Sequence, residues 1–316
     1  MNKILISAPY IIPFMDRFRP VLERHGLDVI MAEVNERLNE DQILSKAGEF
    51  SGTICGDDQY TMRALEACSP QLKVISKWGT GIDSIDKEAA ERFGIKLFRT
   101  PNAFSMPVAD SVMGYVILFA RPLHKMDRIM KSGRWEKITG RALNECTLGV
   151  VGVGNIGKAV VLRARAFGMK VLGNDIVDIS QDFIEETDVE MTALEDLLER
   201  SDFVSLNCDL NPTSFHLMNA QSLSIMKTDS VLINMARGQV VDEPALIEAL
   251  QAGLIAGAAL DVFEIEPLPL DSPLLLMDNV LVAAHNGNTS PTAWERVHWN
   301  SIRNLLEGLG IAPDFE

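Results

Sequence analysis

Thr147-Leu148-Gly149-Val150-Val151-Gly152-Val153-Gly154-Asn155-Ile156-Gly157 is the stretch that decides the fold. It begins as an apolar run of strand length and continues as a G-x-G-x-x-G pattern that opens a helical stretch reaching about Phe167. Gly152 permits a sharp turn, Gly154 lets a phosphate approach the backbone, and Gly157 lets the helix pack closely on the strand. Alone, the pattern fits a plain tight turn as well as a phosphate-binding loop, so its context decides.

The context is a series of almost continuously apolar runs, which are typical of strands buried on both faces. Helical stretches alternate with them, as expected of parallel βαβ units. The runs are Thr147–Val151, Lys170–Gly173, Phe203–Leu206, Val231–Asn234, Ala256–Leu260 and Val280–Ala283. Six such strands, with the glycine pattern after the first, predict a doubly wound dinucleotide-binding (Rossmann) sheet. The N-terminus of the helix would then face the pyrophosphate.

The first third of the chain carries a second series of short strand-like runs. They are Lys3–Ser7, Asp28–Met31, Thr53–Cys55, Lys73–Ser76 and Lys96–Phe98. Helices are predicted at Phe14–His25, Asp41–Ala47, Val108–Phe119 and Thr292–Leu309. Thr100-Pro101-Asn102 is a predicted hinge, because proline disfavours helix in the residue before it. The fold class predicted from these patterns is α/β, with two doubly wound parallel sheets.

Composition limits the function classes. The 316 residues fit two domains at roughly 150 residues each. A formal net charge of −15 argues against a nucleic-acid or anionic-membrane partner, although local cations could still hold an anionic substrate. The four cysteines form no C-x-x-C pair, so no zinc site or disulfide framework is expected. No apolar run approaches the ~18 residues of a membrane span, and the first residues look like a strand, so a cytoplasmic protein without a metal is predicted.

Asp175 is the candidate that selects the cofactor. It follows the strand Lys170–Gly173, about 20 residues after the glycine pattern, where a carboxylate binds the ribose hydroxyls of NAD. A carboxylate at that place repels the additional phosphate of NADP, and no arginine follows closely. NAD is therefore the predicted cofactor. The alternative interpretation of Asp175 is a helix cap in a loop.

Three residues fit the requirements of hydride transfer to a 2-keto acid. The reaction needs a cation for the carboxylate and carbonyl, a proton donor for the carbonyl oxygen, and a partner for that donor. Arg237 follows the strand Val231–Asn234 and can form paired charge-assisted hydrogen bonds. His285 is, among the five histidines, the one that follows a predicted buried strand, and histidine both donates and accepts protons near neutrality. A carboxylate at Glu266 beside it would favour the imidazolium.

Each of these residues also has an ordinary structural interpretation. Arginines after strands are often surface residues, and glutamates next to a proline are usually solvated loop residues. The combination, at the carboxyl ends of predicted parallel strands where ligands bind, favours function.

The chain resembles the D-isomer-specific 2-hydroxyacid dehydrogenases, and is most similar to their short, phosphoglycerate-dehydrogenase-like members. The resemblance extends from about Lys73 to Arg303. It rests on five ordered stretches: Trp78–Asp83, Gly152–Gly157, Asn234–Gly238, Gly257–Pro267 and His285. The resemblance implies that Arg237, Glu266 and His285 are the catalytic residues.

The resemblance also implies binding roles. Backbone N–H groups of Thr80 and Gly81, next to Gly79, are expected to hold the substrate carboxylate. Asp261 is expected to contact the nicotinamide carboxamide. Further cofactor-binding residues implied by the resemblance are Asn155, Ile156, Asn207, Thr213, Ala236 and His285. Lys77 stands where phosphoglycerate-specific relatives often carry an arginine directed at the phosphate, and 3-phosphoglycerate is the favoured substrate. The alternative interpretation of Lys77 is a solvated lysine without a role in binding. Alternatives are a glyoxylate or hydroxypyruvate reductase and, in another class, an NAD-sensing scaffold.

A domain layout and an assembly are implied as well. A flavodoxin-like substrate domain is expected at residues 1–100, completed by a helix at residues 287–316, with a Rossmann NAD domain inserted at residues 101–286. A homodimer is expected, with Val108–Phe119 and Arg121–Arg141 in the contact. The chain departs from the family pattern at Asn207-Cys208-Asp209 and at Asn286-Gly287-Asn288.

Overall fold

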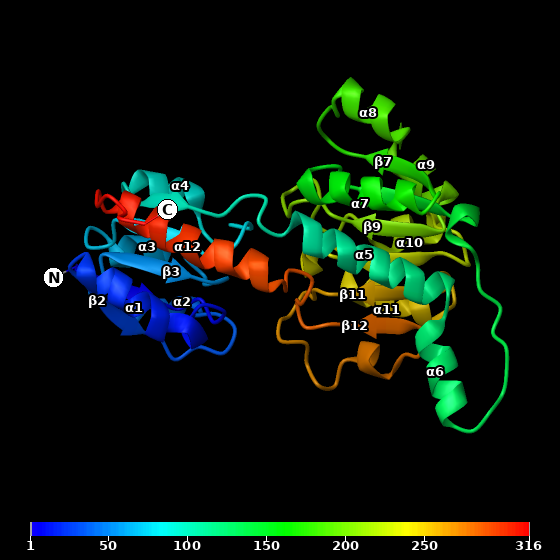
Figure 1. Ribbon diagram of the computed structural model, residues 1–316, viewed down its shortest axis with the longest axis horizontal. Helices are drawn as coiled ribbons and strands as arrows, with labels where there is room; N and C mark the ends of the chain where they lie inside the picture. The colour runs from blue at the N-terminus through cyan, green and yellow to red at the C-terminus, as the bar shows by residue number, and fades with distance from the viewer. Residues whose placement is uncertain (1, 316) are drawn as a thin grey trace. The chain divides into compact units, whose positions relative to one another are not determined.

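The computed structural model describes residues 2–315, and the chain forms two compact units (Figure 1). Unit 1 comprises the chain up to Phe104 and from Ser290 onward, and unit 2 is Ser105–Thr289. The expected divisions after residues 100 and 286 fall a few residues earlier than these. Helix α5 (Ser105–Ala120) begins at Ser105 and belongs to unit 2, whereas Ser290 caps the helix that belongs to unit 1.

Unit 1 contains a parallel sheet with the strand order β2-β1-β3-β4-β5, which is the flavodoxin-like order. Its strands are β1 (Asn2–Ile6), β2 (Leu27–Met31), β3 (Gly52–Cys55), β4 (Val74–Lys77) and β5 (Lys96–Phe98). The five expected strands all form, with bounds within one residue of the prediction. The order reverses between β1 and β3, and that is the point of such a sheet where ligands bind beyond the strand ends.

Amphipathic helices cover this sheet. They are α1 (Met15–Arg24), α2 (Glu40–Leu44), α3 (Met62–Cys68), α4 (Lys87–Arg92) and α12 (Pro291–Gly308), with a 3-10 turn η1 (Ile12–Phe14). Helix α12 returns from the other end of the sequence to pack on β3, β4 and β5 (Figure 1). Ser290 caps it by accepting a hydrogen bond from the Ala293 N–H, and its buried face includes Val297, Ile302 and Leu305. Apolar burial at helical spacing therefore fixes α12 to unit 1.

Unit 2 contains a seven-stranded parallel sheet with the order β12-β11-β10-β9-β6-β7-β8. This is the doubly wound dinucleotide-binding order with β12 added at the edge. The strands are β6 (Thr147–Val151), β7 (Lys170–Asn174), β8 (Glu190–Met191), β9 (Phe203–Leu206), β10 (Val231–Asn234), β11 (Gly257–Leu260) and β12 (Val280–Val282). The six expected strands form. The sequence missed β8, because two residues with an exposed glutamate produce no apolar run.

Helices lie on both faces of this sheet (Figure 1). They are α5, α6 (Leu123–Lys131), α7 (Asn155–Ala166), α8 (Gln181–Thr187), α9 (Leu194–Arg200), α10 (Ala220–Ile225) and α11 (Glu243–Gln251), with 3-10 turns η2 (Leu143–Glu145), η3 (Gly238–Val240) and η4 (Pro273–Leu276). Helix α5 packs along α7, and α6 has no buried residue. Among the described residues, no helix is long and apolar enough to cross a membrane.

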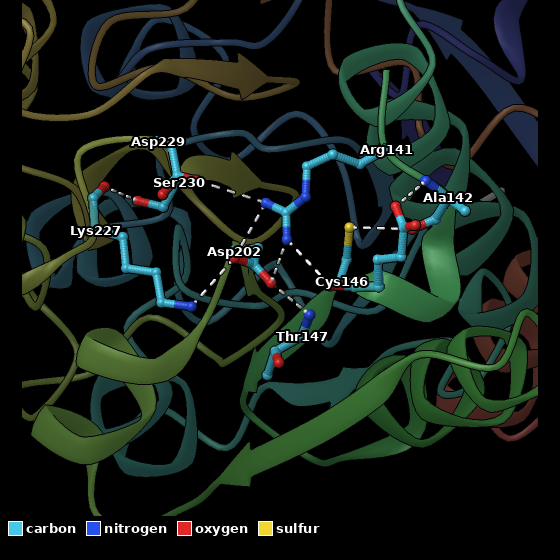
Figure 2. Close-up of polar contacts among 9 residues, drawn as sticks. Arg141, Ala142, Cys146, Thr147, Asp202, Lys227, Asp229 and Ser230 are labelled. Atoms are coloured by element: carbon cyan, nitrogen blue, oxygen red, sulfur yellow. Dashed lines mark hydrogen bonds and ion pairs between the residues drawn. The ribbon is translucent and has the colours of Figure 1, made fainter. Parts of the chain in front are cut away.

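Ion pairs and a backbone hydrogen bond to one aspartate lie at the amino edge of the seven-stranded sheet (Figure 2). Asp202, just before β9, accepts hydrogen bonds from Arg141 Nη1 at 3.1 Å, Lys227 Nζ at 3.1 Å and the Thr147 N–H at 2.7 Å. Burial alone would raise the pKa of the Asp202 carboxyl, but the Thr147 N–H and the two cations outweigh it and lower the pKa. These bonds join the start of β6 to the start of β9. They also attach Arg141, which precedes β6, to this edge of the sheet.

Candidate functional site

The turn between β6 and α7 has the shape of an anion-binding loop. Gly152 has a φ of 86°, and a Cβ there would lie 2.6 Å from the Cys208 N. A Cβ on Gly157 would lie 2.0 Å from the Gly152 carbonyl oxygen, so helix and strand pack too closely for any side chain. A Cβ on Gly154, in contrast, would meet nothing within 4 Å. The backbone at Gly154, the N-cap of α7, is therefore open to an approaching group, and a helix N-terminus with its partial positive charge is suited to an anion.

Asp175 directly follows β7, and the backbone orients its carboxylate. Its Oδ2 accepts a hydrogen bond from the Val153 N–H at 2.7 Å, and its Oδ1 accepts one from the Val177 N–H at 3.0 Å. A carboxylate oxygen has a second lone pair, so both oxygens can still accept hydrogen bonds from ribose hydroxyls. The structure does not support the helix-cap interpretation, because Ser180 occupies the N-cap position of α8.

Three other expected cofactor residues have polar groups that bond within their own loops. The Asn207 amide donates to the Ser205 carbonyl at 3.1 Å, and the Thr213 hydroxyl donates to Asn211 Oδ1 at 2.6 Å. The Ala236 N–H donates to Asn234 Oδ1 at 3.0 Å. Their polar groups thus shape the loops after β9 and β10, which lie at the same edge of the sheet as the glycine turn.

The side chain of Asn234 fixes the turn that carries Arg237 through hydrogen bonds to its backbone. The sequence did not predict this role of Asn234. The Asn234 side chain is buried at the end of β10, accepts from the Ala236 N–H and donates to the Arg237 carbonyl at 2.9 Å. Arg237 Nη1 donates to the Ala236 carbonyl at 2.8 Å. A Cβ on Gly238 would lie 1.9 Å from the Phe263 carbonyl carbon, so this turn packs directly on the next loop. The guanidinium is therefore carried by a fixed backbone.

His285 and Glu266 form the pair that the sequence predicted. His285 Nδ1 lies 3.1 Å from Glu266 Oε2, and each side chain is 22% exposed. The Phe263 N–H donates to Glu266 Oε1 at 3.0 Å, and the His285 N–H donates to the Asp261 carbonyl at 2.8 Å. In neutral imidazole this geometry places the proton on Nδ1, toward the carboxylate, and turns Nε2 away from it. The arrangement is that of an oriented proton donor and acceptor.

Asp261 holds the loop that follows His285. It is buried at the end of β11, where its Oδ1 accepts from the Asn286 N–H and its Oδ2 from the Gly287 N–H, both at 2.8 Å. A Cβ on Gly287 would lie 2.3 Å from Met235 Cε and 2.9 Å from Asp261 Oδ2. The sequence assigned Asp261 to the cofactor. The structure adds a positioning role, because both oxygens bind the backbone next to His285.

In unit 1, the loop after β4 presents two N–H groups. The Thr80 hydroxyl donates to the Thr100 carbonyl at 2.9 Å, and the Thr100 N–H donates to the Gly79 carbonyl at 2.8 Å. Gly79 has a φ of 118°, which favours glycine. Within residues 2–315, the N–H groups of Thr80 and Gly81 donate to no protein acceptor. Adjacent backbone donors of this kind are suited to a carboxylate.

Trp78 anchors this loop to α12. Its indole Nε1 donates to His298 Nδ1 at 2.9 Å, which requires a neutral imidazole. Burial lowers the pKa of His298 to about 4, so the ring stays neutral and structural at physiological pH.

Lys77, the last residue of β4, lies in an ion pair. Its Nζ is 3.1 Å from Asp57 Oδ1 and donates to the Trp78 carbonyl at 3.1 Å. The sequence did not predict the role of Asp57, because Asp57 follows β3 whereas Lys77 ends β4, and no spacing rule joins the two. Within the described chain, no group of three or more His, Cys, Asp or Glu side chains could hold a metal ion.

Comparison with known proteins yields one family. Residues 113–287 match the model of the D-isomer specific 2-hydroxyacid dehydrogenase NAD binding domain. The matched segment contains the glycine turn, Asp175, Arg237, Asp261, Glu266 and His285, all of which belong to unit 2.

Three similar proteins differ in the substrate that their names give. The chain is 38% identical over 314 residues to a D-3-phosphoglycerate dehydrogenase of Methanocaldococcus jannaschii, covering 98% of this chain and 58% of the relative. It is 40% identical over 258 residues to a glyoxylate reductase of Thermofilum pendens, covering 79% and 75%. A D-lactate dehydrogenase of Aquifex aeolicus, solved with NAD and lactic acid, aligns with a TM-score of 0.85 and 27% identity over 98% of both chains. The chain thus spans little more than half of the first relative.

Proposed function

The chain belongs to the D-isomer specific 2-hydroxyacid dehydrogenases, and on that premise we propose that it interconverts a small 2-keto acid and the corresponding D-2-hydroxy acid with NAD. The observation that carries the proposal is the pair of His285 Nδ1 and Glu266 Oε2 at 3.1 Å, at the carboxyl edge of the seven-stranded sheet. A positioned imidazole with a carboxylate partner can protonate a carbonyl oxygen in one direction and deprotonate a hydroxyl in the other.

The substrate is held by its carboxylate in this proposal. The N–H groups of Thr80 and Gly81, adjacent to Gly79, and the Arg237 guanidinium supply the donors. Bound NADH supplies the hydride for C2. Arg237 polarises the carbonyl, and His285 transfers the proton to its oxygen while Glu266 stabilises the charge that the ring carries before transfer.

The cofactor-binding residues follow from the same edge of the sheet. We assign the pyrophosphate to the turn and first helical residues Gly152, Gly154, Asn155, Ile156 and Gly157. The ribose hydroxyls are assigned to Asp175, whose oxygens are oriented by two backbone N–H groups. Asn207, Thr213, Ala236 and Asp261 complete the proposed cofactor contacts from the loops after β9, β10 and β11.

Two candidate classes of substrate differ in whether the acid carries a phosphate. The relative from Methanocaldococcus jannaschii and the position of Lys77 favour 3-phosphoglycerate, which is the expectation from sequence. The relative from Thermofilum pendens and the Lys77–Asp57 ion pair favour an unphosphorylated acid such as glyoxylate or hydroxypyruvate. We place the unphosphorylated acids first, because the ammonium that would attract a phosphate is already paired.

Initial rates of NADH oxidation with a panel of 2-keto acids test this function. The panel contains glyoxylate, hydroxypyruvate, pyruvate and 3-phosphohydroxypyruvate. Turnover of at least one of them, with NADH preferred over NADPH, is expected. Binding of NADH without turnover of any acid would contradict the dehydrogenase and support an NAD-sensing scaffold.

A homodimer is the proposed assembly. Helix α6 and the following segment expose several large apolar side chains, which a partner could cover. They are Leu123, Met130 and Trp135, the last with 86% of its surface exposed. Light scattering coupled to gel filtration should give twice the 34.9 kDa of the chain, and Trp135→Ser with Met130→Ser should shift the protein toward monomer. A wild-type monomer at micromolar concentration would contradict the proposal. The cytoplasmic location stays a prediction.

A further inference from the structure

The carboxyl edge of the five-stranded sheet carries buried charges beside its switch point. Ser7 follows β1, Asp57 and Asp58 follow β3, and Lys77 ends β4. All except Asp57 are almost completely buried. Ligands of such sheets bind beyond the strand ends where the strand order reverses, which here is between β1 and β3. The sign of the charge at this edge therefore bears on what binds there.

The positive charge at this edge is covered by a negative one. The Lys77 side chain is 5% exposed and that of Asp57 is 30% exposed, with Nζ and Oδ1 3.1 Å apart. A second bond from the same ammonium goes to the Trp78 carbonyl. A molecule arriving from solvent thus meets the Asp57 carboxylate before it meets the Lys77 ammonium.

A second carboxylate lies behind this pair. Asp58 accepts hydrogen bonds from the Leu38 N–H at 2.8 Å and from the Ser7 hydroxyl, and it is fully buried. Burial raises the pKa of the Asp58 carboxyl to about 6, against the lowering effect of those two hydrogen bonds. Above that pH the two aspartates and the one lysine sum to a net negative charge.

Gly79 links these charges to the proposed substrate loop. A Cβ built on Gly79 would lie 3.7 Å from Lys77 Nζ, and Thr80 and Gly81 are the next residues along the chain. A small acid whose carboxylate lies on those N–H groups is therefore held next to the Lys77–Asp57 pair.

We propose that Asp57 determines the substrate class: by neutralising Lys77 it excludes a phosphate on the substrate and restricts the enzyme to 2-keto acids whose substituent carries no negative charge. The inference rests on the proposed function. A phosphate dianion that approached Lys77 would be repelled by Asp57 at a similar distance, so the attraction of the ammonium would be cancelled. An uncharged hydroxymethyl or hydrogen substituent meets no such repulsion.

The test compares two acids that differ only in the phosphate, hydroxypyruvate and 3-phosphohydroxypyruvate. The ratio of kcat/KM for the phosphorylated acid to that for the unphosphorylated one is expected to be below one in the wild type. Asp57→Asn keeps the size of the side chain and removes the carboxylate that is paired with the ammonium. The ratio should then rise about tenfold or more, since removal of one negative charge at this distance from a phosphate is worth roughly that factor.

The matched control is Glu36→Gln, which removes one negative charge from the neighbouring loop. Glu36 accepts from the Tyr10 hydroxyl at 3.0 Å and belongs to neither the Lys77 pair nor the proposed machinery. It should change the ratio less than twofold. Asp57→Ser serves as a second variant, and the melting temperature and circular dichroism report folding of each protein.

Three outcomes overturn the inference. A wild type that prefers the phosphorylated acid, or an unchanged ratio in both Asp57 variants while turnover persists, contradicts the role of Asp57 and leaves the dehydrogenase intact. Absence of turnover with both acids and with glyoxylate, while NADH binds, overturns the proposed function and the inference together.

Discussion

The two edges of the seven-stranded sheet use polar side chains in different ways. At the amino edge, Asp202 is bound by Arg141 and Lys227, so opposite charges neutralise each other (Figure 2). At the carboxyl edge, Asp261 is bound by backbone N–H groups, and Asn234 bonds to the backbone of the Arg237 turn. Ion pairs dominate at the amino edge, whereas at the carboxyl edge uncharged backbone groups hold the side chains to which we assign the proposed chemistry.

We therefore expect the amino edge to affect mainly the stability of the protein and the carboxyl edge to affect mainly catalysis. Charge neutralisation at the amino edge joins β6 to β9 and contributes to the free energy of unfolding. Backbone bonds to Asp261 and Glu266 fix the loops of the carboxyl edge, so that Glu266 can act on His285. Substitutions at the two edges should therefore change different measured quantities.

The largest effect is expected from His285→Ala. Removal of the proton donor should lower kcat by about 10²-fold or more and leave NADH binding and the melting temperature nearly unchanged. His216→Ala is the control, since His216 Nε2 forms a similar pair with Glu264 Oε1 at 2.7 Å but is assigned no proton transfer. Equal losses of kcat in the two variants would show that histidine–glutamate pairs here only hold loops together.

Asp202→Ala should have the opposite profile. It leaves Arg141 and Lys227 without their shared carboxylate and the Thr147 N–H without its acceptor. The free energy of unfolding should fall by about 2 kcal/mol, below the range for fully buried pairs because both cations are more than a third exposed. Denaturant titration measures this, and kcat should stay within about twofold of the wild type.

The same variant has a predicted pH dependence. The pKa of Asp202 is lowered in the folded protein, so the unfolded chain binds the proton more readily as the pH falls. The stabilisation is complete above the ordinary aspartate pKa of about 3.9 and is lost as the pH falls through the folded value. Wild type and variant should converge in acid. The control is Asp229, an exposed carboxylate 3.7 Å from Arg141. Asp229→Ala should change the free energy of unfolding by less than about 0.5 kcal/mol.

A smaller effect is expected from Asp261→Asn. An amide presents an N–H₂ group to one of the two backbone N–H donors, so one bond to the loop after His285 is lost. The kcat should fall about tenfold through misplacement of His285, with a modest loss of stability. Asp242→Asn, at the N-cap of α11, is the control, since asparagine caps as well as aspartate. Unchanged kcat in Asp261→Asn would remove Asp261 from the account of the site.

The smallest effect concerns cofactor preference. Asp175→Asn removes the charge that repels an additional phosphate on the ribose, so the ratio of the NADPH to the NADH dissociation constant should fall about fivefold. Asp178→Asn, on the same loop, should leave the ratio unchanged. A purely structural role of Asp175 would weaken both cofactors equally and would contradict the assignment.

The sequence predicted unit 2 well because six of its seven strands are almost continuously apolar runs that are each followed by a motif residue. Arg237, Glu266 and His285 could be selected because parallel strands bring their carboxyl ends to one edge. Asn234 and Asp261 were present in the same motifs, but their hydrogen bonds to backbone N–H groups depend on turn geometry that residue types do not specify. β8 was too short to leave a pattern.

In unit 1 the strands could be predicted from the sequence, but one ion pair could not. Its five strands were predicted, and so was the role of α12 in completing the domain. The sequence also singled out Lys77, yet its partner Asp57 lies 20 positions earlier at the end of another strand. Pairs across neighbouring loops are set by tertiary packing, and the polar stretch Gly56-Asp57-Asp58 looked like an ordinary turn. The charge at this edge, on which the proposed substrate class depends, therefore could not be predicted from residue types alone.

The most direct test of the account is the chirality of the product. Hydroxypyruvate is reduced with NADH, and the glycerate formed is resolved by chiral chromatography, for the wild type and His285→Ala side by side. We predict D-glycerate from the wild type and at least ~10²-fold slower formation from the variant. L-Glycerate, or equal rates from the two proteins, would contradict proton transfer by the His285–Glu266 pair in a D-specific dehydrogenase.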